Sequence, residues 1–134
     1  LLHYFGGEIK KINIASKTYD KSSIPNYVTT SIEFKNSIIG SYSSYWNSPG
    51  GWSVTLFGKN ITILFKPLEK GLIIDSNFNT KKLDPDKNDL KFKSGFYFQI
   101  IDFIKLIKKN KIIAPNLLTS YDTMLLTNKL YKHK

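Results

Sequence analysis

Residues 28–35 read VTTSIEFK, and after a two-residue turn residues 38–46 read IIGSYSSYW. In the first stretch apolar and polar side chains alternate, and a period of two places successive side chains on opposite faces of a β-strand. Val28, Ile32 and Phe34 therefore share one face of that strand. Two such strands joined by a short turn predict an antiparallel hairpin, which we take as the centre of the fold.

The same period of two extends on both sides of this hairpin. One further strand is expected before it and three after it, at residues 8–18, 52–57, 61–66 and 72–75. Short turns containing Gly, Asn or Pro separate most of these segments, as in antiparallel sheets. We therefore expect a mainly antiparallel, open-faced sheet of about six strands, followed by an irregular polar stretch from residue 76 to residue 94.

From Gly95 onward the spacing of apolar residues is that of an α-helix. The apolar stripe of this helix consists of Phe96, Ile100, Phe103, Ile104 and Ile107. We expect the stripe to pack onto one face of the sheet. Pro115 separates it from a second helix, in which Thr119 and Asp122 have the spacing of a capping box. The fold class is therefore α+β, a single domain of residues 1–134 with two C-terminal helices on one face of the sheet.

The first seven residues, LLHYFGG, have the pattern of the end of a helix. Apolar side chains crowd one turn and two glycines follow, which is how helices commonly end. No N-cap residue precedes them. We therefore expect the chain to be the later part of a longer protein, with the start of this helix missing.

The composition excludes several functional classes. Hydrophobic residues make up 41% of the chain, too many for a disordered protein. Cysteine is absent and only two histidines occur, so we expect neither thiolate chemistry nor a metal site. No apolar run approaches the ~20 residues of a spanning helix, and no signal peptide is visible. We expect a cytoplasmic protein with no membrane partner.

The net charge of +10 comes from 20 basic residues, all of them lysines. Acidic residues interrupt the lysine groups, which favours a solvated surface. Arginine forms paired hydrogen bonds with guanine edges and with phosphates, so its absence argues against a nucleic-acid partner. Two alternatives stay open: a lysine-based nucleic-acid-binding domain, and a non-catalytic module that docks an acidic protein.

Aromatic side chains with polar tips gather around a break at Pro49-Gly50-Gly51. The candidate substrate-binding residues are Tyr42, Tyr45, Trp46, Asn47 and Trp52. Rings that stack and groups that hydrogen-bond suit a sugar or polyol. The alternative is that these side chains fill the sheet core or a subunit contact. Tyr45 and Trp46 are neighbours on a strand, so we expect them to point to opposite faces.

The strands carry more aromatic side chains than one core needs. Helices on one side of an antiparallel sheet leave its other side to water or to a partner. Because large apolar patches usually mark interfaces, we expect an apolar free face and a homodimer, or a higher homo-oligomer, formed by face-to-face packing about a two-fold axis.

Four short motifs follow one another along the chain. They are Gly6-Gly7-Glu8, Glu33-Phe34-x-Asn36, Gly50-Gly51-Trp52-x-Val54-x-Leu56-x-Gly58 and Gly95-Phe96-x-x-Gln99-Ile100-x-Asp102-Phe103-Ile104. Each motif is weak alone, but their order and spacing over essentially the whole chain resemble one family. The chain resembles the C-terminal domain of the glucose–fructose oxidoreductase and inositol dehydrogenase (Gfo/Idh/MocA) family.

This resemblance implies part of an NAD(P)-dependent oxidoreductase. Such an enzyme transfers hydride between a nicotinamide and a hydroxyl or ketone carbon of a sugar, polyol or nucleotide-sugar. The Rossmann domain, which binds NAD or NADP, and the catalytic residues would precede Leu1, so residues 1–134 would hold no catalytic and no cofactor-binding residue. His3 would align with a variable position. The resemblance nominates Tyr42 or Tyr45 as a substrate contact and implies that the chain alone is inactive.

Overall fold

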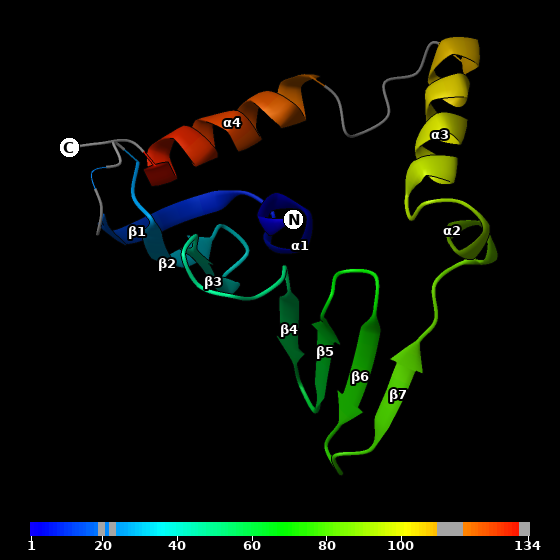
Figure 1. Ribbon diagram of the computed structural model, residues 1–134, viewed down its shortest axis with the longest axis horizontal. Helices are drawn as coiled ribbons and strands as arrows, with labels where there is room; N and C mark the ends of the chain where they lie inside the picture. The colour runs from blue at the N-terminus through cyan, green and yellow to red at the C-terminus, as the bar shows by residue number, and fades with distance from the viewer. Residues whose placement is uncertain (19–20, 22–23, 110–116, 132–134) are drawn as a thin grey trace. The chain divides into compact units, whose positions relative to one another are not determined.

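The structure is a computed structural model that describes residues 1–18, 21, 24–109 and 117–131. The chain forms two compact units, each with its own antiparallel sheet (Figure 1). The first unit combines Leu1–Ser48 with Ala114–Lys134, and the second is Pro49–Ile113. The α+β class and the antiparallel pairing predicted from the sequence are confirmed. The strands form a three-stranded and a four-stranded sheet rather than one sheet of about six strands.

The first unit contains a three-stranded sheet of order β1-β2-β3. Its elements are α1 (Leu2–Gly6), β1 (Ile9–Lys17), β2 (Tyr27–Phe34), β3 (Ile39–Tyr45) and α4 (Leu117–Tyr131). The predicted central hairpin is confirmed, with β2 and β3 paired in register from Tyr27 opposite Tyr45 to Glu33 opposite Ile39. Helix α1 is capped by Gly7, whose positive φ of 81° is one that glycine adopts without strain.

The alternation of β2 decides where the core lies. Val28, Ile32 and Phe34 are at most 2% exposed, as their shared face predicts, and Leu130 of α4 is 6% exposed. The Phe34 ring fills the space left by two glycines: an added Cβ would lie 2.3 Å from it at Gly6 and 3.1 Å from it at Gly40. Helix α1 and strand β3 therefore meet around this one ring.

The second unit contains a four-stranded sheet of order β4-β5-β6-β7. Its elements are β4 (Val54–Gly58), β5 (Ile61–Phe65), β6 (Gly71–Asp75), β7 (Thr80–Leu83), α2 (Lys87–Lys91) and α3 (Phe96–Lys109). Strand β7 and helix α2 lie in the stretch predicted to be irregular. The sequence signal for α2 is Asp86, the N-cap residue, whose carboxylate accepts a hydrogen bond from the backbone N–H of Asn88.

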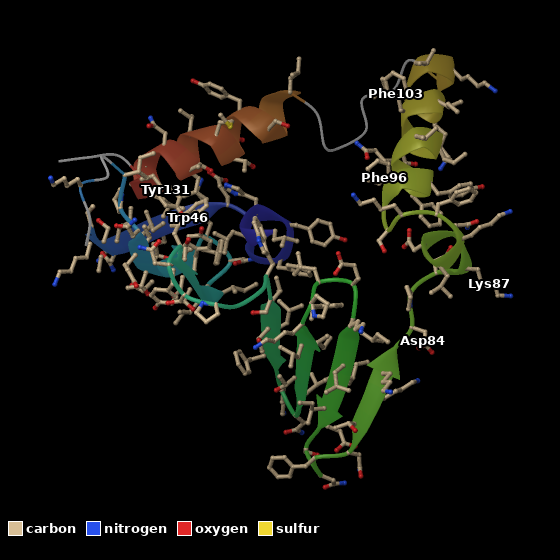
Figure 2. All side chains as sticks on the ribbon, in the orientation of Figure 1. Trp46, Asp84, Lys87, Phe96, Phe103 and Tyr131 are labelled. Atoms are coloured by element: carbon tan, nitrogen blue, oxygen red, sulfur yellow. The ribbon has the colours of Figure 1, made fainter. Side chains whose placement is uncertain are left out.

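The prediction that the apolar stripe of α3 packs onto a sheet is wrong. Phe96, Phe103 and Ile107 are 51%, 61% and 64% exposed, and Figure 2 labels the first two. Helix α3 packs against α2, which has only five residues and cannot cover a helix of fourteen. No described residue from 49 to 108 is buried, so this unit supplies no covering surface for the stripe.

The start of the last helix also differs from the prediction. Helix α4 begins at Leu117, so Thr119 lies within the helix and cannot be its N-cap. A capping box therefore does not start this helix. Pro115, the predicted separator, lies outside the described residues.

Candidate substrate-binding site

Strand β3 carries the candidate residue Tyr42 on the core side of the first sheet. Tyr42 pairs with Thr30 of β2 and is half-buried, whereas Thr30 is 5% exposed. The Thr30 hydroxyl accepts a hydrogen bond from the backbone N–H of Tyr42 at 3.0 Å and donates one to its backbone oxygen at 3.2 Å. The buried Thr30 side chain thus fixes the position of the backbone that carries the Tyr42 ring.

Helix α4 brings a second phenol to Tyr42. The hydroxyl oxygens of Tyr42 and Tyr131 lie 2.8 Å apart, in hydrogen-bond contact. The ring centroids of Trp46 and Tyr131 lie 6.4 Å apart at an interplanar angle of 70°, an edge-to-face contact (Figure 2). The indole of Trp46 is 68% exposed. Two phenol hydroxyls and one exposed indole therefore form a cluster, which we call the Tyr42–Tyr131–Trp46 cluster.

The environment of Tyr42 keeps its phenol protonated. Burial raises the pKa of Tyr42 above its usual range, and the hydrogen bond to Tyr131 raises it further. A hydrogen bond from Ser44 opposes both effects. At neutral pH Tyr42 therefore offers a neutral hydroxyl, which suits the hydroxyl groups of an uncharged ligand.

Tyr45 does not join this cluster. Its ring contacts Tyr27 at a centroid distance of 5.6 Å, and Trp46 instead contacts Tyr131. The prediction that Tyr45 and Trp46 point to opposite faces is therefore confirmed. Because Tyr42 and Trp46 are four residues apart and both contact Tyr131, the structure brings together these two of the five candidates.

The outer face of the first sheet is polar. The hydroxyls of Thr29 and Ser43 lie 3.1 Å apart, and the Asn13 side-chain amide donates to the Ser31 hydroxyl at 3.3 Å. All four side chains are exposed. The prediction of an apolar free face is therefore wrong for the three-stranded sheet, because polar side chains occupy the middle of this face and its aromatic residues are the single pair Tyr27 and Tyr45 at one end of the strands.

The remaining two candidates are Asn47 and Trp52. Asn47 is exposed in the turn after β3, and Trp52, which is 80% exposed, belongs to the second unit. Sequence reasoning missed Tyr131, which completes the cluster. The available signal was its place beside Leu130 at the end of the last helical pattern, but nothing local paired that helix with β3.

The second unit has an open groove of about 380 Å³ between β6, β7 and the segment that leads into α3. Its lining combines apolar side chains with three carboxylates, those of Glu69, Asp84 and Asp89. The Asp89 carboxylate already accepts a hydrogen bond from the backbone N–H of Gly95 at 2.8 Å. Within the described ranges, no three acidic, histidine or cysteine side chains come close enough to hold a metal ion.

Two further findings concern the chain as a whole. None of the helices in the described part of the chain is long and apolar enough to cross a membrane. No protein-family model matches the sequence, and neither the curated proteins nor the solved structures give a match.

Proposed function

We propose that this chain is the substrate-covering domain of an NAD(P)-dependent oxidoreductase that acts on a sugar, a polyol or a nucleotide-sugar. The observation that carries the proposal is the Tyr42–Tyr131–Trp46 cluster. An exposed indole offers a face on which the C–H surface of a sugar ring stacks, and the phenol hydroxyls beside it can exchange hydrogen bonds with ligand hydroxyls.

The enzyme class rests on the motif order quoted above. In this proposal a Rossmann domain earlier in the same polypeptide binds NAD or NADP and carries the catalytic residues. The present chain closes over the substrate, and the protein works in the cytoplasm without a nucleic-acid or membrane partner. Residues 1–134 contain no G-x-G-x-x-G sequence, which supports the assignment of cofactor binding to another domain.

Fluorescence of Trp46 tests the sugar site. In a Trp52→Phe background Trp46 is the only tryptophan, so its emission reports on the cluster. D-glucose should change this emission in a saturable way, and Tyr42→Phe should weaken binding about two- to tenfold through the loss of a hydrogen bond. Tyr45→Phe is the matched control on the opposite face and should leave the affinity unchanged. Equal effects of the two variants would contradict the site.

Calorimetry with NADH and NADPH tests whether the cofactor-binding site lies outside residues 1–134. The chain alone should bind neither dinucleotide at micromolar concentration, since it has no Gly-rich turn that feeds the N-terminus of a helix. A longer polypeptide that carries the preceding residues should bind one of them. Micromolar binding by residues 1–134 alone would contradict the assignment.

We also propose a homodimer formed through the four-stranded sheet. The register places six half-buried apolar side chains on one face of it, namely Val54, Leu56, Ile63, Phe65, Ile73 and Leu83. None of residues 49–108 is buried, so nothing within this unit covers the face. A second copy of the chain can cover this face in a stable dimer if the contact buries more than roughly 1,000 Å² in total.

Light scattering measures the dimer. The net charge of +10 opposes association, so the dimer fraction should rise with salt as the repulsion is screened. Leu56→Lys should give a monomer, whereas Thr55→Lys, which adds the same charge on the opposite face, should not. Circular dichroism confirms that both variants are folded. A wild-type chain that stays monomeric at high protein and salt concentrations would rule out the dimer.

A further inference from the structure

Tyr131 occupies the last position of α4, and its backbone is well anchored. The preceding residue, Leu130, is 6% exposed and is the contribution of α4 to the buried core of the first unit. Tyr131 itself is half-buried. A side chain next to such an anchor is held in place against β3, where it meets Tyr42 and Trp46 at once.

The hydrogen bond between the two phenols can run in either direction. Their hydroxyl oxygens lie 2.8 Å apart, and either one can be the donor. A phenol has one proton to donate and lone pairs that accept. Whichever way the contact with Tyr42 runs, the Tyr131 hydroxyl therefore keeps a proton or a lone pair for a hydrogen bond to another group.

The ring of Tyr131 also fixes the orientation of the indole. Its edge-to-face contact with Trp46 holds the indole in place while 68% of that side chain stays exposed. Pre-organised rings lose less conformational entropy when a ligand stacks on them. One side chain thus acts on both parts of the candidate site, the hydroxyl pair and the stacking surface.

We propose that Tyr131 is a ligand-binding residue of this site, whose hydroxyl exchanges a hydrogen bond with a hydroxyl of the bound sugar or polyol and whose ring holds the Trp46 indole in its stacking orientation. This inference rests on the proposed function. It assigns the end of the last helix to the substrate site, so the site is built from α4 as well as from β3.

The test compares sugars that lack single hydroxyls. The chain with Trp52→Phe is titrated with D-glucose and with its 1-deoxy, 2-deoxy, 3-deoxy, 4-deoxy and 6-deoxy derivatives, which together lack each hydroxyl once, and Trp46 emission is recorded. Tyr131→Phe keeps the ring and removes only the hydroxyl. It should weaken D-glucose binding about two- to tenfold, as expected for one lost hydrogen bond. With the deoxy sugar that lacks the hydroxyl bound by Tyr131, the same variant should cause no loss.

Matched variants separate binding from folding. Tyr121→Phe changes an exposed tyrosine of the same helix and should alter neither affinity nor melting temperature. Tyr131→Phe should leave the emission maximum of the unliganded Trp46 unchanged, because the ring contact remains. Tyr131→Ala should shift that maximum and weaken every sugar of the series.

The outcomes distinguish this inference from the function on which it rests. If wild-type chain binds D-glucose and Tyr131→Phe binds the whole series with unchanged affinity, Tyr131 is no ligand-binding residue and the proposed function stands. If the loss is the same for every deoxy sugar, the hydroxyl of Tyr131 makes no specific bond to the ligand. If none of the sugars changes Trp46 emission in the wild-type chain, the proposed sugar site fails and the role of Tyr131 fails with it.

Discussion

Replacing Phe34 by alanine should lower the free energy of unfolding of the first unit by about 3–5 kcal/mol. Phe34 is 2% exposed, and its ring lies so close to Gly6 and Gly40 that a side chain at either position would crowd it. Truncation would leave a cavity bounded by α1, β2 and β3. Because the backbone of these elements is tied by hydrogen bonds, the cavity cannot close completely and the full cost is expected.

Urea unfolding followed by Trp46 emission measures this loss, again in the Trp52→Phe background so that only the first unit is observed. Phe57→Ala is the matched control, since it removes the same side chain at a position that is 83% exposed. It should change the unfolding midpoint of the first unit little. A loss below about 1 kcal/mol for Phe34→Ala would mean that this ring is not buried in solution.

Gly6→Ala should destabilise the first unit by about 1–3 kcal/mol. A Cβ at this position would lie 2.3 Å from the Phe34 ring, far inside van der Waals contact, so the ring or the helix must move. Glycine to alanine inside a helix otherwise favours the folded state, by up to about 1 kcal/mol. The sign of the effect therefore separates a close contact from an ordinary helix position.

The same urea experiment gives the sign, and two further variants identify the cause. Gly50→Ala, where an added Cβ meets no atom within 4 Å, should be close to neutral. Phe34→Leu removes the ring that the new methyl group at position 6 would strike, so the double variant should lose less stability than the sum of the two single losses. Strict additivity would mean that Gly6 and Phe34 do not touch.

Local patterns in the sequence determined most of the strands. The alternation at residues 28–35 predicts both β2 and the identity of its buried face, and the structure buries Val28, Ile32 and Phe34 as predicted. Such predictions succeed because a strand's two faces alternate with every residue, whatever the strand packs against. Strand β7 and helix α2 were not predicted because they are only four and five residues long, which is too short to show a period of apolar residues.

Helix α3 shows what an apolar pattern in the sequence does not specify. Its apolar stripe predicts a helix correctly, but amphipathicity does not specify what covers the stripe, and in the structure Phe103 is 61% exposed. The division of the strands into two sheets is likewise absent from the pattern. Every observed pair joins strands that are consecutive in the sequence, and the alternation within each strand does not show that β3 and β4, although consecutive, stay unpaired.

The candidate site, too, could be predicted from the sequence only in part. The sequence by itself determined that aromatic residues with polar tips gather at the end of the third strand, and strand alternation separated Tyr45 from Trp46. Only the tertiary structure decided that Tyr131 joins them, because the two residues whose hydroxyls meet at 2.8 Å are 89 positions apart in the sequence. That contact follows from the burial of Leu130, which docks the last helix onto the first sheet, and no local pattern in either segment specifies it.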